Sequence, residues 1–154
     1  MWQRIQTVFL VVVIISMVGL IFMPIWVFQP DTENSHMLFA LHYTEKANGV
    51  ANTLYMPYAI TAMLAMAAAA IAFISIRKFK NRVLQMKLGA LNSLLMLGAM
   101  VSIVVFVMDL AKSHNGGQYG SGFWMIAMGV AANFLANRFI RRDEKLVRDS
   151  ERLR

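Results

Sequence analysis

The sequence predicts an all-α membrane protein: a bundle of four transmembrane helices whose fourth helix continues into a basic cytoplasmic helix. Of its 154 residues, 58% are hydrophobic. They form four runs of roughly 20 residues, the length that crosses a hydrocarbon layer ~30 Å thick at 1.5 Å rise per residue. No charge lies near the middle of a run, where it would cost about 2.5–3.5 kcal/mol. We therefore expect one membrane domain, 1–154, with spans at about 8–28, 54–76, 88–110 and 120–140.

The first run, 8–28, is interpreted as a retained span and not a cleaved signal peptide. Its apolar stretch is longer than a signal core, and no small-x-small cleavage site follows it. Pro24 and Trp26 stand at its far end, where a helix-ending proline and an interfacial aromatic are expected. An external loop, 29–53, comes next. Its turn signal around Asn48 and Gly49 predicts a short hairpin on the outer face.

The second and third runs are expected to pack as an antiparallel hairpin, because the loop between them, 77–87, is too short for a domain. The second run is rich in alanine, which lets helix backbones approach closely in lipid. The third run carries small residues four apart, Gly89 with Ser93 and Gly98 with Ser102. Both features favour tight packing between helices.

The fourth run has no helix-breaking residue after Gly129, so the helix is expected to pass the membrane surface and continue through 141–154. Phe139, Leu146 and Leu153 recur every seven residues in this basic stretch. Such spacing places an apolar stripe along a charged helix. Membrane topology alone does not require that stripe.

Charge counting predicts that both termini are cytoplasmic. All but two of the 15 Lys and Arg residues lie near the termini or in the 77–87 loop, the exceptions being Lys46 and Lys112. Cytoplasmic segments of membrane proteins carry such an excess of cations. We therefore expect a multi-pass membrane protein with both termini in the cytoplasm.

Polar residues inside the spans form the first candidate site. Asn92 and Asn133 lie at similar expected depth near the cytoplasmic side, and Asn137 follows on the same helix face. Gln6 and Ser75 are expected to reach this layer from the first two spans. We interpret the set as a helix-packing polar cluster, with hydrogen bonds of ~0.6 kcal/mol on average and ~1.7 at most. The alternative is the polar site of a small oligomeric transporter or channel, formed by the three asparagines.

Catalytic and metal chemistry have weak support in this sequence. It contains no cysteine, which excludes thiolate sites. His36, His42 and His114 are external with methionines nearby, a ligand combination that suits copper, but two loops would have to converge. Ser35, His42 and Glu45 could form a triad only on paper, since no nucleophile motif surrounds Ser35. We expect no catalytic residue, no cofactor and no metal, and thus a non-enzymatic protein.

The cytoplasmic surface is the stronger candidate. Its cations are expected to attract anionic lipid headgroups, at about 1 kcal/mol each. A sharper hypothesis is that the protein is an accessory or scaffold subunit that docks a protein partner or a larger complex. A translocase and a ribosome both fit this hypothesis, and a ribosome would bring contact with ribosomal RNA. The sequence does not fix the oligomeric state. The residues assigned to this surface are Arg77, Lys78, Lys80, Arg82, Lys87, Arg138, Arg141, Arg142, Lys145, Arg148 and Arg152.

Three stretches carry a family resemblance: Met1–Thr7, Lys80–Leu88 and Asn133–Arg154, the last with the pattern Asn-x-Leu-Ala-Asn-Arg-x-Ile-Arg. With them the whole chain resembles a Bacteroidota family of small four-span inner-membrane proteins, described as domain of unknown function 4293. The resemblance implies four spans and an inner membrane. It implies no reaction, no cofactor and no catalytic residues.

Overall fold

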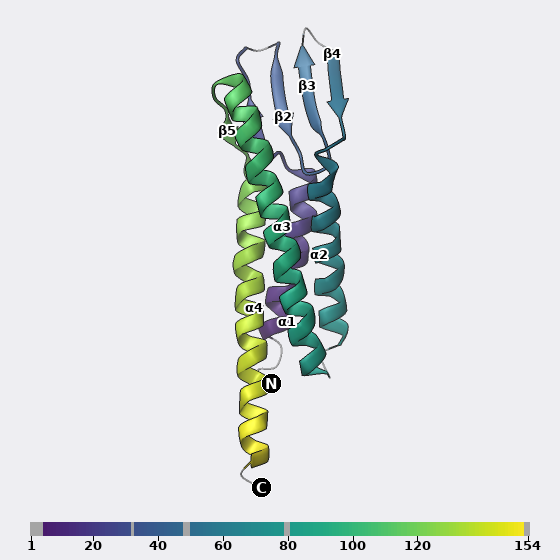
Figure 1. The fold of residues 1–154 in the computed structure, drawn as a ribbon, viewed down its shortest axis with the longest axis vertical. Coiled ribbons are helices and arrows are strands. Elements are labelled where there is room, and N and C mark those ends of the chain that lie inside the picture. The colour runs from purple at the N-terminus through teal and green to yellow at the C-terminus, as the bar shows by residue number, and fades with distance from the viewer. Residues whose placement is uncertain (1–4, 32, 48–49, 79–80, 153–154) are drawn as a thin grey trace.

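The computed structural model describes residues 5–31, 33–47, 50–78 and 81–152. Helices dominate it: α1 (Ile5–Phe22), α2 (Ala59–Arg77), α3 (Arg82–His114) and α4 (Ser121–Arg152). The four helices run side by side along the long axis of an elongated molecule (Figure 1). All four are long and apolar enough to cross a membrane.

A small β-sheet covers one end of the bundle (Figure 1). It contains five antiparallel strands in the order β4-β3-β2-β1-β5, so the prediction of an all-α protein is wrong in this respect. The strands are β1 (Trp26–Phe28), β2 (Ser35–Leu38), β3 (Tyr43–Ala47), β4 (Val50–Leu54) and β5 (Gln118–Tyr119).

The first span differs most from its expected bounds. α1 ends at Phe22, and the residues expected to complete the span to Phe28 instead form β1. Pro24 separates the two elements, and the Trp-Val-Phe sequence of β1 has high β propensity. Apolar length alone does not distinguish such a strand from the last turns of a helix.

The hairpin expected within 29–53 is β3–β4, and it belongs to the larger sheet. Ala47 lies opposite Val50 in this pair, while Asn48 and Gly49 lie outside the described residues. β1 pairs with β2 on one side and with β5 on the other. The loop before α4 is therefore hydrogen-bonded to the segment that follows α1.

α3 and α4 both extend past the spans predicted at 88–110 and 120–140, and for α4 this continuation is what the sequence predicted. Asn81 precedes α3, and its side chain caps the helix by accepting a hydrogen bond from the Leu84 amide at 3.0 Å. Asn115 follows the helix and takes the left-handed conformation common at helix ends, with φ 53°. α4 runs without a break for 32 residues, roughly 48 Å at 1.5 Å per residue.

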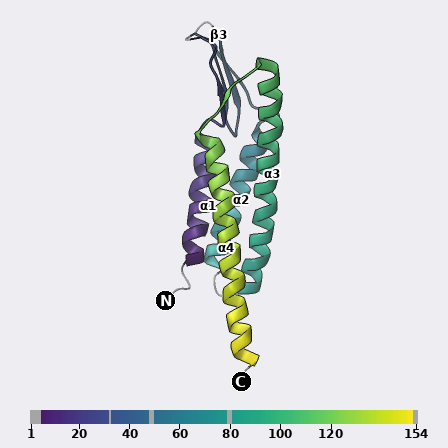
Figure 2. The ribbon, with the colours of Figure 1, turned by 90° about the vertical axis from the view of Figure 1, so that its left-hand side faces the viewer.

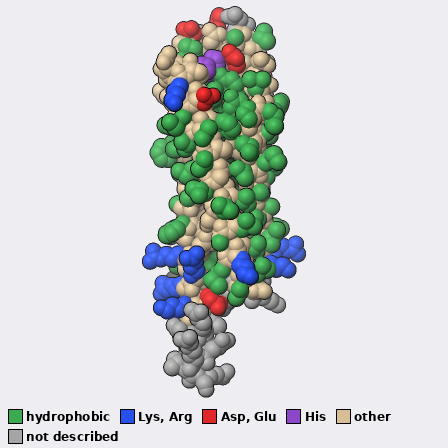
Figure 3. Space-filling view, viewed as in Figure 1, with side chains coloured by type: hydrophobic (Ala, Val, Ile, Leu, Met, Phe, Trp, Pro, Cys, Tyr) green, Lys and Arg blue, Asp and Glu red, His purple; other side chains and the backbone are tan. Residues whose placement is uncertain are grey.

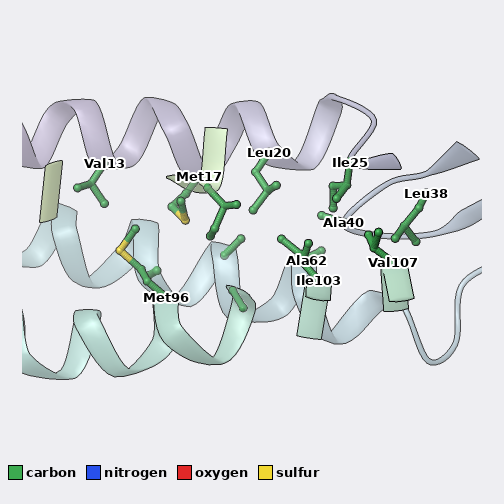
Figure 4. Packing of buried hydrophobic residues seen from close by; sticks show 14 of the residues in the cluster. Val13, Met17, Leu20, Ile25, Leu38, Ala40, Ala62, Met96, Ile103 and Val107 are labelled. Carbon is green, nitrogen blue, oxygen red and sulfur yellow. The ribbon is translucent and has the colours of Figure 1, made fainter. Parts of the chain in front are cut away.

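The interior of the bundle is apolar from its middle up to the sheet (Figure 4). Met17 of α1 and Met96 of α3 lie in it, and Leu38 and Ala40 close it beneath the sheet. The inner face of α2 is almost entirely alanine, which lets α1 and α3 approach its backbone. These alanines are Ala62, Ala65, Ala68 and Ala72.

The two ends of the molecule differ in chemistry (Figure 3). Lys and Arg side chains gather at the end where α1 and α3 begin and α2 ends, hereafter the basic end. Histidine and further acidic side chains lie at the other end, hereafter the sheet end, although an acidic side chain is also seen beside the cations of the basic end. From the basic end α4 extends beyond the other three helices in both views (Figures 1 and 2).

Candidate functional site

Three asparagines predicted to share a layer come together at the α3–α4 interface. Asn92 donates to the Asn133 side-chain oxygen at 3.1 Å, and Asn133 donates to the Ser93 hydroxyl at 2.8 Å. Asn137 donates to the same hydroxyl and to the Gly89 carbonyl, both at 3.1 Å. We call Gly89, Asn92, Ser93, Asn133 and Asn137 the asparagine cluster. Its bonds join two helices, as a packing role requires.

Gly89 makes this close approach feasible. A Cβ placed on it would overlap the amide of Asn137. Ser93 is also specifically required for these contacts. Its hydroxyl accepts hydrogen bonds from Asn133 and Asn137 of α4 and donates one to the Gly89 carbonyl at 3.0 Å. The small-x-x-x-small pair of the sequence thus contributes hydrogen bonding as well as space.

Gln6, Ser75 and Gln85 are buried polar residues nearer the basic end, and no hydrogen bond among the described residues joins Gln6 or Ser75 to the asparagine cluster with which they were predicted. Gln85 donates to the Ser75 carbonyl at 3.3 Å, which joins α3 to α2. Gln85 is 1% exposed, yet it was absent from the predicted site. Its spacing could have predicted this burial, because Gln85 precedes Asn92 by two helical turns on the same face of α3.

Several buried oxygens of the asparagine cluster and of these three residues have no hydrogen-bond partner among the described residues. They are Gln6 Oε1, Ser75 Oγ, Gln85 Oε1, Asn92 Oδ1 and Asn137 Oδ1. Unpaired buried polar atoms cost about 1–3 kcal/mol each. All five belong to residues of the basic half of the bundle.

The apolar stripe of α4 divides into two parts. Phe139 stacks on Phe9 of α1, with ring centroids 5.6 Å apart, and Ile140 is buried. Leu146 is 61% exposed, so it lies past the region where α1 covers the stripe. The side chains of Val147 and Leu153 lie outside the described part.

The predicted cation surface is exposed wherever the structure describes it. Of that set, Lys80 lies outside the described residues, as do the side chains of Arg82, Arg148 and Arg152. The exposed members are Arg77, Lys78, Lys87, Arg138, Arg141, Arg142 and Lys145.

At the sheet end the structure brings two of the three histidines together. The rings of His36 and His114 lie 4.3 Å apart, whereas His42 stacks on Phe39 at 4.9 Å. Within the described residues, no group of three His, Cys, Asp or Glu side chains could hold a metal ion. The Nδ1 atom of His42 is buried without a hydrogen-bond partner among the described residues. In the catalytic triad considered for Ser35, His42 and Glu45, this atom therefore makes no hydrogen bond to either of the other two residues.

Burial is the main cause of the pKa shifts of His36 and Tyr43 at the sheet end. Burial and the neighbouring His114 lower the pKa of His36 below its ordinary value of 6.5, against the raising effect of Glu45. Burial, with smaller effects of Glu45 and Tyr58, raises the pKa of Tyr43 to about 12. His36 is therefore neutral and Tyr43 protonated at neutral pH.

Comparison with known proteins gives one family. No curated protein matches the chain. The family model described as Domain of unknown function (DUF4293) matches residues 2–153, essentially the full length. With four helices able to cross a membrane, this indicates a multi-pass membrane protein. The chain belongs to the DUF4293 family.

Proposed function

We propose that the protein is a non-enzymatic accessory or scaffold subunit of the bacterial inner membrane, which binds a partner protein through its basic end. The observation that carries this proposal is the length and direction of α4. Its 32 residues span roughly 48 Å, against a hydrocarbon layer of ~30 Å. The excess extends from the basic end along the bundle axis (Figures 1 and 2).

The charge pattern supports a cytoplasmic position for this end. Both the start of α1 and the end of α4 lie there, together with Arg77, Lys78 and Lys87 beside the α2–α3 connection. An excess of Lys and Arg beside spans marks the cytoplasmic side. On this proposal, the exposed surface of α4 faces the cytoplasm.

The direction of α4 favours a protein partner over lipid headgroups alone. Attraction to anionic headgroups falls off within a Debye length, about 8–10 Å. The last turns of a helix that follows the bundle axis leave that zone, whereas a lipid-bound helix would turn into the membrane plane. Where α4 leaves the bundle, Arg141, Arg142 and Leu146 form a cationic surface with one exposed apolar side chain. Such a surface is complementary to an acidic protein with an apolar contact, as a subunit of a translocase or a membrane-bound ribosome could supply.

The test is co-purification in gentle detergent, followed by mass spectrometry, with quantitative comparison of variants. The double variant Arg141→Glu, Arg142→Glu should lose the partner while remaining folded, because both side chains are exposed. Lys112→Glu is the control, since it reverses an exposed cation in the last turn of α3, away from the basic end, and should retain the partner. A homomeric sample without a partner, or equal retention by both variants, would overturn the proposal. If ribonuclease treatment removed the partner, the basic end would be binding RNA and not a protein, which would also overturn the proposal.

A small oligomeric transporter or channel is the second candidate, and the unpartnered buried oxygens support it. Against it, the apolar side chains of Met17, Met96 and Ile103 fill the interior above the asparagine cluster (Figure 4). Replacing Asn92, Asn133 and Asn137 together with alanine separates the candidates. A transporter would lose transport, whereas a scaffold would keep its partner.

A further inference from the structure

Three donor atoms converge at the junction between the sheet and α3. The Tyr43 hydroxyl lies 2.7 Å from His36 Nδ1 and 3.5 Å from His114 Nε2. His36 comes from β2, Tyr43 from β3 and His114 from the last turn of α3. His36 and His114, which were expected to lie in separate loops, therefore both lie next to the Tyr43 hydroxyl oxygen.

The proton on the His114 ring can be placed from its partners. His114 Nδ1 lies 2.9 Å from the Leu110 carbonyl oxygen, which can only accept, so Nδ1 carries the hydrogen. The Ser113 hydroxyl, also 2.9 Å from this nitrogen, donates to the same carbonyl and can accept from the ring. His114 Nε2 consequently keeps its lone pair and directs it at the Tyr43 hydroxyl.

The proton on His36 is not fixed in the same way, because the Tyr43 hydroxyl, 2.7 Å from His36 Nδ1, can either accept or donate. In one tautomer His36 Nδ1 donates to the phenol oxygen, and the hydroxyl hydrogen is directed at His114 Nε2. In the other the hydroxyl donates to His36 Nδ1, and His114 Nε2, at 3.5 Å, has at most a long contact. This second tautomer is the one that presents two imidazole lone pairs beside the phenol oxygen.

The spacing suits a metal ion. Ligand atoms about 2.0–2.1 Å from a tetrahedral ion lie roughly 3.3 Å from one another. The separations of the phenol oxygen from the two ring nitrogens, 2.7 and 3.5 Å, lie on either side of this value. The bond from His114 Nδ1 to a backbone carbonyl is also the outer support that orients metal-ligating histidines.

The surroundings hold the three donors in place. Trp26 and Phe28 pack against the His114 ring, with centroids 5.7 and 5.4 Å away. Glu45 lies opposite His36 in the β2–β3 pair and brings a negative charge close to the site. The described residues contain no group of three His, Cys, Asp or Glu side chains that could hold a metal, so a site at this place needs the phenol oxygen as its third donor.

We propose that His36 Nδ1, His114 Nε2 and Tyr43 Oη bind a divalent transition-metal ion of the copper and zinc class. Two imidazoles and a phenolate suit these ions. On binding, the Tyr43 O–H bond breaks, its proton passes to water and the oxygen bonds to the ion, with no change of oxidation state.

Copper(II) titration of the full-length protein in detergent tests the site. Trp2→Phe and Trp124→Phe leave Trp26 as the sole reporter among the three tryptophans, and its ring lies 5.7 Å from His114. Bound copper should quench it. His36→Gln and His114→Gln should each weaken binding by roughly 100-fold or more, since even outer-sphere changes cost about 10–100-fold. His42→Gln is the matched control and should leave the affinity unchanged.

A second measurement does not depend on the folding of any histidine variant. Electron paramagnetic resonance of the wild-type protein with one equivalent of copper(II) should show coupling to two imidazole nitrogens. A phenolate-to-copper absorption band should appear and be absent in Tyr43→Phe. Copper(II) should displace zinc(II) from the same site, because it binds nitrogen and oxygen ligands more tightly. Binding that survives both histidine changes, or a spectrum without imidazole coupling, would overturn the proposal.

Discussion

Asn92 and Asn133 form a side-chain hydrogen bond of 3.1 Å between α3 and α4, in a bundle whose interior is otherwise largely apolar. Each is nearly inaccessible to solvent, with 1% and 3% of its surface exposed. A buried amide that loses its partner cannot turn to water without opening the helix interface. The pair therefore fixes which faces of α3 and α4 meet.

The first prediction concerns the strength of this pair. Asn92→Ala and Asn133→Ala should each destabilise the bundle, and the double variant should lose less than the sum of the two. The difference, the coupling free energy, should be about 0.6–1.7 kcal/mol. Unfolding in mixed micelles measures it. Strict additivity would show that the two residues act independently.

The second prediction concerns Gly89. Gly89→Ala should destabilise the bundle by about 1–3 kcal/mol, because its Cβ would overlap the Asn137 amide. Gly98→Ala is the control: its Cβ would meet Leu64 Cδ1 at 3.5 Å, an ordinary contact. Adding Asn137→Ala should partly rescue Gly89→Ala. Equal stability of the two glycine variants in detergent would contradict the packing described for α3 and α4.

The third prediction separates the two parts of the α4 stripe. Phe139→Ala should destabilise the protein by about 1 kcal/mol or more, because it removes the stack on Phe9. Leu146→Ala should leave stability unchanged, since the Leu146 side chain is 61% exposed, but should weaken partner binding. Thermal unfolding and co-purification, run on both variants, measure the two effects. Destabilisation by Leu146→Ala would mean that the bundle itself uses this residue.

The fourth prediction is a pH dependence in metal-free protein held in chelator. Burial and His114 lower the pKa of His36, while Glu45 opposes them and Tyr43 shares its hydrogen bond. The unfolded chain, with a pKa near 6.5, takes up a proton before the native state does. This contribution to stability is complete above pH 6.5 and is lost as the pH falls towards the lower native pKa.

Comparison with His36→Gln isolates the effect from other titrating groups. The difference in unfolding free energy between wild type and variant should be constant above pH 6.5 and should change below it. A parallel pH profile for the two proteins would show that His36 has the same pKa in both states.

The sequence predicted the elements that depend on local pattern. Apolar length located four helices, and equal distance from the flanking cations placed Asn92 and Asn133 at one depth, where they bond. Gln85 was missed because it lies beside Lys87, in a stretch that reads as a polar loop although α3 has already begun.

Pairings between distant segments left no comparable signal. β5 is only two residues long, and its pairing with β1 depends on how the helices place their ends. For the same reason His36 and His114 were expected apart, although their rings lie 4.3 Å from each other. Spacing within one helix can be read from a chain, whereas contacts across a sheet require its register.

The pairing of β1 with β5 has a consequence for assembly. It joins the sheet, which otherwise comes entirely from the first half of the chain, to the segment that links α3 and α4. If the backbone were cut in the α2–α3 connection, each fragment would be a helical hairpin carrying complementary strands. Two such fragments, synthesised separately, should find each other in the bilayer and reconstitute the native bundle.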